Sequence, residues 1–133
     1  MPSVMLDTNI VSDLVRNPHG KVAAKIAAIG ADPVRVSIIV AAELKYGAAR
    51  SESPKLRERI EGILSRLDVM PFESPADTEY ARIRNDLARA GTPIGWNDLL
   101  IAAHALALRL PLVTGNTREF SRVPGLVVEN WLE

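Results

Sequence analysis

The chain has 133 residues, 47% hydrophobic and 24% charged, which suits one globular domain over residues 1–133 and excludes a disordered or fibrous protein. Cysteine is absent, which excludes disulfides, thiol nucleophiles and cysteine-bound zinc. The 16 basic and 16 acidic side chains cancel, so net charge gives no argument for nucleic-acid binding.

Short apolar runs alternate with helical patterns along the chain, and turn residues separate them. This alternation indicates an α/β fold with a mainly parallel sheet. In chain order, we expect a strand at 4–6, helices at 10–15 and 21–29, a strand at 34–38, helices at 40–50 and 54–67, a strand at 69–72, helices from 75 to about 91 and at 97–109, and strands at 112–114 and 126–128.

Neither a membrane span nor a signal peptide is expected. No apolar run approaches the roughly 18 residues that a spanning helix needs. The N-terminus has no basic region and reaches an acid at Asp7. We therefore expect a cytoplasmic protein.

Polar residues follow several of the predicted strands, where ligands gather in open parallel sheets. Asp7 follows the first strand, Glu43 lies in the helix after the second, Asp98 begins the apolar helix, and Asn116 and Glu119 follow the fourth. Carboxylates brought to one edge repel each other unless a cation lies among them. Oxygen ligands suit Mg²⁺ or Mn²⁺, so the pattern suggests metal-assisted phosphodiester hydrolysis.

Each of these residues also has a structural interpretation. Asp7 could cap the next helix, and Asp98 could complement a helix dipole. Glu43 could lie on a solvated helix face, and Asn116 could be a turn residue. His19 is expected in a surface loop, His104 in a structural role, and Trp96 in packing at a helix start, with a substrate groove as its alternative.

Three segments together resemble the PIN-domain ribonucleases, and most of all the VapC toxins of bacterial toxin–antitoxin pairs. They are VMLDTNIVSDL, GTPIGWNDLLIAAHALAL and LVTGNTREFSRVPGLVVENW, and the resemblance runs from about residue 3 to residue 132. It implies a three-layer α/β/α PIN-like fold whose sheet has five mainly parallel strands, with acids meeting at one end.

Carried over by position, the resemblance makes Asp7, Glu43 and Asp98 the catalytic acids. Many PIN domains have Asp where this chain has Asn116, so either Asn116 or Glu119 fills the fourth position, and Glu119 supplies the charge in the second case. The supporting polar residues would be Thr8, Asn9, Thr114 and Asn116.

The resemblance also implies a mechanism and partners. Asp7 and Asp98, with Glu43 directly or through water, would hold Mg²⁺ or Mn²⁺ for attack of water on RNA, with a second ion as an option. The RNA is expected to be tRNA, including initiator tRNA, and its cleavage to stop translation and growth. A VapB-like antitoxin would cover the acidic groove, often by inserting a basic side chain, and the chain would form a homodimer.

Aromatic side chains make up only 5% of the chain, few for a base-stacking platform. Contacts from Lys and Arg to the RNA backbone are therefore the better expectation. Each candidate could equally be a solvated surface charge; the candidates are Lys45, Arg50, Arg82, Arg84, Arg89 and Arg118.

Two rival interpretations share the expected fold. A receiver domain of a two-component system would have adjacent acids after its first strand, but Thr8 follows Asp7. An inactive PIN-like interaction module would explain the missing acid at Asn116, but Asp7, Glu43 and Asp98 argue against it. A requirement for metal in RNA cleavage distinguishes the enzyme from the module.

Overall fold

A computed structural model describes residues 2–133 of the chain. In this part, five parallel strands form one sheet in the order β3-β2-β1-β4-β5. The strands are β1 (Val4–Leu6), β2 (Val34–Ser37), β3 (Asp68–Met70), β4 (Leu112–Val113) and β5 (Val128–Glu129). The helices are α1 (Thr8–Arg16), α2 (Lys21–Ile29), α3 (Ile38–Ser51), α4 (Pro54–Arg66), α5 (Ala76–Arg89), α6 (Trp96–Leu108) and α7 (Thr117–Phe120).

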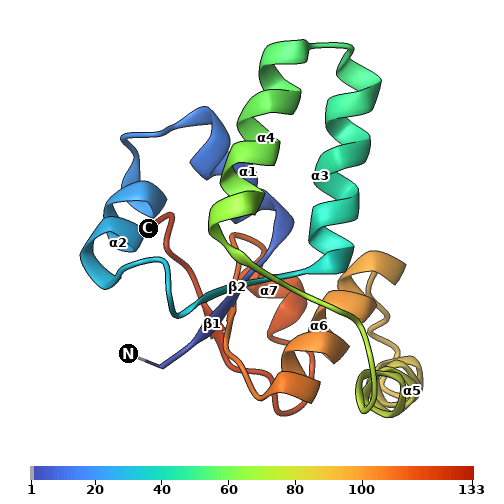
Figure 1. Ribbon diagram of the computed structural model, residues 1–133. Helices are drawn as coiled ribbons and strands as arrows, with labels where there is room; N and C mark the ends of the chain where they lie inside the picture. The colour runs from blue at the N-terminus through green and yellow to red at the C-terminus, as the bar shows by residue number, and fades with distance from the viewer. Residues whose placement is uncertain (1) are drawn as a thin grey trace.

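Helices lie on both faces of the sheet, which confirms the expected three-layer α/β/α architecture. Figure 1 shows α3 and α4 as an antiparallel pair on the side where α1 and α2 lie, with α5 and α6 on the opposite side. Right-handed crossovers explain this division, because the chain moves from β1 to β3 in one direction and returns to β4 and β5 in the other. The sheet is covered on both faces, so its central strands are uniformly apolar and buried.

Local chemistry explains where the element boundaries differ from those expected. Helix α3 starts at Ile38 rather than near residue 40, because the Ser37 Oγ accepts a hydrogen bond from the Ile39 N–H at 3.1 Å and caps the helix. Strand β3 ends at Met70 rather than at 72, since Pro71 has no N–H to donate to a ladder. The short α7 after β4 was not expected.

The strand order fixes the place of the site. Strand β1 lies between β2 and β4, and the chain leaves β1 toward one edge and returns to the other side of it at β4. Leu6 pairs with both Val36 and Val113, so the next residues, Asp7 and Thr114, emerge side by side at the carboxyl end of the sheet. This reversal of strand order is where open α/β sheets bind ligands.

None of the helices in residues 2–133 combines the length and the apolar character needed to cross a bilayer.

Candidate active site

Asp7 is the most firmly held acid of the site. Its side chain is only 5% exposed. Its Oδ1 accepts a hydrogen bond from the Thr8 N–H at 2.7 Å, and its Oδ2 accepts one from the Thr114 Oγ1 at 2.8 Å. Asp7 is thus the N-cap of α1 and also a buried acid at the strand ends. The capping interpretation and the site interpretation are therefore compatible.

Glu43 reaches the same place from α3. Its Oε1 accepts a hydrogen bond from the Thr8 Oγ1 at 3.2 Å, so the residue after Asp7 links the two acids. The side chain is half-buried, and Asn97 at the start of α6 also donates to it. Thr8 of α1 and Asn97 of α6 therefore hold the Glu43 side chain. It does not lie on a solvated face of α3, which was the alternative expected from the sequence.

Asp98 lies in the first turn of α6, whose N-cap is Gly95. Glu119 connects this helix start to the loop after β4. Its Oε1 accepts from the Gly95 N–H at 3.1 Å, and its Oε2 accepts from the Asn116 Nδ2 at 2.6 Å. Glu119 also shares a hydrogen bond with Asp98. Both oxygens of Glu119 are therefore engaged in holding other parts of the site.

The smaller polar residues complete this network as expected. Thr114 is fully buried, and its Oγ1 accepts from the Asn116 N–H at 3.0 Å while it donates to Asp7. The Asn9 Oδ1 accepts from the Gly115 N–H at 3.2 Å. Helix α1 and the β4–α7 loop are thereby tied together around Asp7.

A cavity of about 560 Å³ joins these residues. Asp7, Glu43, Asp98 and Asn116 line its polar end, together with Thr8 and Asn9. Glu119 is not part of the wall. The remainder is largely apolar and lies between α1, α3 and α4, with walls formed by Val15, Leu44, Gly47, Ala48, Leu56 and Ile60.

Two cavity residues, Ser12 and Arg16, were missed from the sequence. Thr8, Ser12 and Arg16 follow one another at helical intervals of four, so they share one face of α1. That spacing was the signal that could have found them.

Three of the four acids, Asp7, Glu43 and Asp98, have raised pKa values, because they are buried and lie near one another's charges. Burial, and then the charge of Glu119, raises the pKa of Asp7 despite its hydrogen bonds to Thr114 and Thr8. Burial and the charge of Asp7 raise the pKa of Glu43. For Asp98, burial and the charges of Glu119, Asp7 and Glu43 raise the pKa to about 7. Near neutral pH, part of the negative charge is therefore suppressed by bound protons.

Glu119 behaves in the opposite way. Burial acts to raise its pKa, but hydrogen bonds from the Gly95 N–H, Asn116 and Asp98 outweigh this and lower it. In the Asp98–Glu119 hydrogen bond, Asp98 therefore holds the proton and Glu119 carries the charge.

The donor set fits a hard divalent cation. Within residues 2–133, no ion pair joins Asp7, Glu43, Asp98 or Glu119 to a Lys or Arg. The same residues hold no three acids or histidines already close enough to enclose an ion. The fit therefore rests on chemistry: converging carboxylate oxygens with raised pKa values, beside the amide of Asn116, are ligands that Mg²⁺ and Mn²⁺ prefer.

The histidines and Trp96 have separate environments. His104 is 1% exposed, its Nδ1 lies 2.7 Å from the Ser37 Oγ, and its ring packs edge-on against Phe72, so its expected structural role is confirmed. His19 is exposed in the loop before α2. Trp96 is 71% exposed, with the Arg84 guanidinium 5.3 Å from its ring centre, so the expectation that it packs into the helix start is wrong for the single chain.

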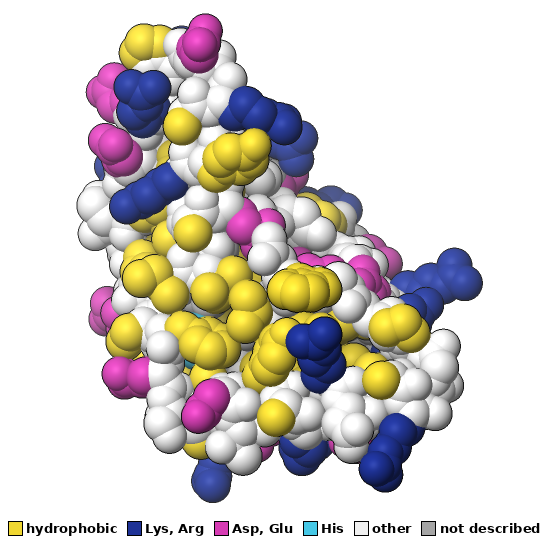
Figure 2. Space-filling model, turned by 90° about the vertical axis from the view of Figure 1, so that its right-hand side faces the viewer, with side chains coloured by type: hydrophobic (Ala, Val, Ile, Leu, Met, Phe, Trp, Pro, Cys, Tyr) yellow, Lys and Arg dark blue, Asp and Glu magenta, His cyan; other side chains and the backbone are white. Residues whose placement is uncertain are grey.

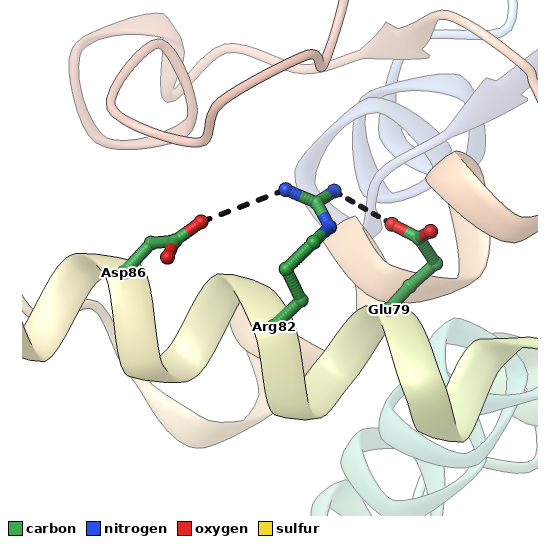
Figure 3. Close-up of polar contacts among 3 residues, drawn as sticks. All are labelled: Glu79, Arg82 and Asp86. Atoms are coloured by element: carbon green, nitrogen blue, oxygen red, sulfur yellow. Dashed lines mark hydrogen bonds and ion pairs between the residues drawn. The ribbon is translucent and has the colours of Figure 1, made fainter.

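Several of the cations proposed from the sequence already have partners. Arg82 lies between Glu79 and Asp86 on α5, with N–O distances of 2.6 and 3.6 Å (Figure 3). Arg84 lies over Tyr80 and Trp96, and Arg50 lies over Tyr46. None of the six candidates lines the acidic cavity.

The chain is similar to a known domain family and to several known proteins. The family described as "PIN domain" matches residues 4–126. The "tRNA(fMet)-specific endonuclease VapC" of Shigella flexneri is 40% identical over 132 residues, which cover 98% of this chain and 99% of the relative. "Ribonuclease VapC2" of Rickettsia felis is 38% identical over 129 residues, 96% of each chain.

Two solved structures agree closely with the fold. VapBC2 from Rickettsia felis, bound to a DNA fragment from its promoter, superposes with a TM-score of 0.91 at 35% identity and covers 96% of this chain and 98% of its own. DNA-bound VapBC from Salmonella typhimurium gives 0.88 at 36% identity, with 98% and 99% covered. The superposed part covers at least 96% of this chain and at least 98% of each solved chain.

Proposed function

This chain belongs to the PIN-domain family and, within it, to the VapC ribonucleases, and from this premise we propose that its acidic cavity hydrolyses RNA phosphodiester bonds with the help of Mg²⁺ or Mn²⁺. The observation that carries the proposal is the meeting of Asp7, Glu43 and Asp98, from three separate elements, in one cavity where none of them forms an ion pair within residues 2–133. The relative from Shigella flexneri is named for initiator tRNA, so we propose tRNA as the substrate class.

The side chains would divide the work as follows. Asp7 and Asp98 would hold the cation, and Glu43 would do so directly or through water. When bound, the cation lowers the pKa of water and stabilises negative charge on a phosphoryl oxygen. Thr8 and Thr114 hold the carboxylate of Asp7 in place, and Asp98 would have to be deprotonated to bind the cation.

We assign the fourth position to Asn116 as a neutral oxygen donor and give Glu119 a positioning role. Asn116 lines the cavity, whereas Glu119 lies behind it with both oxygens engaged. The sequence left open a catalytic role for Glu119, and we do not propose that role. Glu119 would act by holding the Gly95 N–H at the start of α6, and thereby Asp98.

The direct test is cleavage of purified tRNA and total RNA, followed by mapping of the new ends. We expect specific cuts with Mg²⁺ or Mn²⁺, no cuts with EDTA, and recovery when the metal is restored. Cleavage that persists in EDTA would contradict metal dependence. Absence of cleavage with either metal, by folded protein free of antitoxin, would contradict the ribonuclease proposal.

We also propose a VapB-like antitoxin partner, as in the compared VapBC complexes. The cavity offers such a partner two chemistries: a cluster of buried and half-buried carboxylates for a basic side chain, and an apolar wall between α1, α3 and α4 for hydrophobic ones. One inserted segment would exclude both metal and RNA. The complex is therefore expected to be inactive in the cleavage assay until the antitoxin is removed.

A homodimer would use the face on which hydrophobic side chains remain exposed. Ile38 at the start of α3 is 46% exposed, and Tyr46 and Trp96 are 66% and 71% exposed. The face drawn in Figure 2 has hydrophobic side chains gathered at its centre, with a basic side chain among them and most other charged side chains around them. Exposed apolar patches of this kind mark interaction sites. Sedimentation is expected to give a dimer for the wild type and a monomer for Ile38→Glu, while a monomeric wild type would contradict the proposal.

A further inference from the structure

A second cavity, of about 460 Å³, adjoins the acidic one, and both include Arg16 in their walls. It lies where α1 ends and α2 begins. Besides Arg16, its lining includes His19 and Lys21, and Asp13 is its only acid. The two cavities meet across Arg16, so a strand that leaves the acidic site past this side chain reaches the second cavity next.

Arg16 and Lys21 form no ion pair within residues 2–133, in contrast to Arg82. Within residues 2–133, the Arg16 side chain makes one hydrogen bond, from its Nε to the Ser12 carbonyl oxygen at 3.3 Å, and the outer edge of the guanidinium bonds to no other group. Asp13 is already engaged, since its Oδ1 accepts from the Asn17 Nδ2 at 2.8 Å. Arg16 and Lys21 therefore exceed the single acid of this cavity, Asp13, by one positive charge.

The positive surface continues along α2. Lys21 and Lys25 lie four residues apart and so share a helix face, where their two like charges repel each other. Lys25 extends over the Trp131 ring, its Nζ 5.9 Å from the ring centre, beside Leu132 of the second cavity. Such a pair is stabilised when an anion lies between or beside the two ammonium groups.

We propose that this surface, formed by Arg16, His19, Lys21 and Lys25, is a subsite for the phosphate backbone of the RNA strand on one side of the cleaved bond. The inference rests on the proposed ribonuclease function and adds the path of the substrate. Arg16 holds a phosphate close to the acidic cluster, and the α2 lysines hold phosphates farther along. Backbone contacts of this kind position a nucleic acid without reading its sequence.

The test separates binding from cleavage. In the inactive Asp7→Asn background, the Kd for a tRNA mixture is measured across a salt series by fluorescence anisotropy for Lys21→Gln, for Lys25→Gln and for both together. Each lysine lost is expected to weaken binding several-fold and to reduce the slope of log Kd against log salt by about 1. Lys55→Gln is the matched control, because Lys55 is also an exposed first-turn lysine, on α4.

With Asp7 intact, the double variant is expected to show a raised KM for tRNA and an unchanged kcat. The inference is overturned if the α2 variants match Lys55→Gln in both Kd and salt slope. It is also overturned if they lose affinity for the antitoxin while binding RNA normally, which would assign the cavity to an acidic antitoxin segment. Wild-type cleavage, measured in the same series, reports separately on the proposed function.

Discussion

Asp7→Asn is expected to reduce RNA cleavage at least about 100-fold while the fold remains intact. Changing an outer-shell partner of a metal site already costs roughly 10- to 100-fold, and this substitution removes a negative ligand itself. Asn has nearly the same shape as Asp and can still accept from the Thr8 N–H. The Thr114 hydroxyl, which donates to the Asp7 carboxylate, can rotate to accept from the new amide instead.

The measurement is the cleavage rate of tRNA at saturating Mg²⁺, with circular dichroism and thermal melting on the same samples. Asp77→Asn provides the control, because Asp77 is an exposed acid in the first turn of α5, remote from the cavity lining. Cleavage by Asp7→Asn at the wild-type rate would remove Asp7 from the proposed mechanism. A variant that is inactive and also melts well below the wild type would require comparison with Asp7→Glu, which keeps the charge.

The sequence predicted the three central acids because each follows a rule about position. Asp7 comes directly after an apolar run, and residues after parallel strands gather at one edge of the sheet. Glu43 and Asp98 lie near the starts of helices that begin at the same edge. Their individual structural interpretations competed with the catalytic one until the family resemblance was added, because a cap and a ligand have the same sequence signature.

The fourth position depended on contacts that spacing does not reveal. Asn116 and Glu119 lie three residues apart on either side of the α7 start, so both could reach the site. Two hydrogen bonds determine where the Glu119 side chain lies. One comes from the Asn116 Nδ2, and the other comes from the N–H of Gly95, which is 24 positions away in the sequence. Trp96 presents the same difficulty, since an aromatic residue at a helix start predicts packing, whereas in the single chain its partner is Arg84.

The cancelling charges of the composition also have a spatial explanation. Four of the 16 acids meet at the carboxyl ends of the strands, where burial and then mutual repulsion raise the pKa values of Asp7, Glu43 and Asp98. Cations on α1 and α2 that form no ion pair within residues 2–133 lie beside this cluster. A net charge of zero therefore does not exclude a local acidic site bordered by a positive surface.

Asp98→Asn is expected to abolish cleavage to a similar extent and, in metal-free buffer above pH 7, to stabilise the fold. Burial, with the charges of Glu119, Asp7 and Glu43, raises the pKa of Asp98 from 3.8 to about 7. The folded chain therefore keeps this proton up to about pH 7, whereas the unfolded chain loses it near pH 4. The resulting stabilisation is complete below pH 4 and is lost as the pH rises through 7.

Asn at this position imitates the protonated acid at every pH, because its amide can still donate to Glu119 as protonated Asp98 does. At pH 8 in EDTA, we expect the variant to be more stable than the wild type by about 1 kcal/mol, after allowance for the half-exposed position. This corresponds to roughly 3–5 °C in Tm for a domain of this size. At pH 4 the two proteins are expected to melt together.

The measurement is the Tm of the wild type and of Asp98→Asn across this pH range, with and without Mg²⁺. Mg²⁺ is expected to stabilise the wild type at pH 8 and to have little effect on Asp98→Asn, since a cation compensates the same repulsion that the substitution removes. Asp77→Asn is expected to leave the pH dependence unchanged. Equal Tm values for wild type and Asp98→Asn at pH 8 in EDTA would mean that the cluster carries no electrostatic strain, and the main physical argument for a cation in this cavity would fail with it.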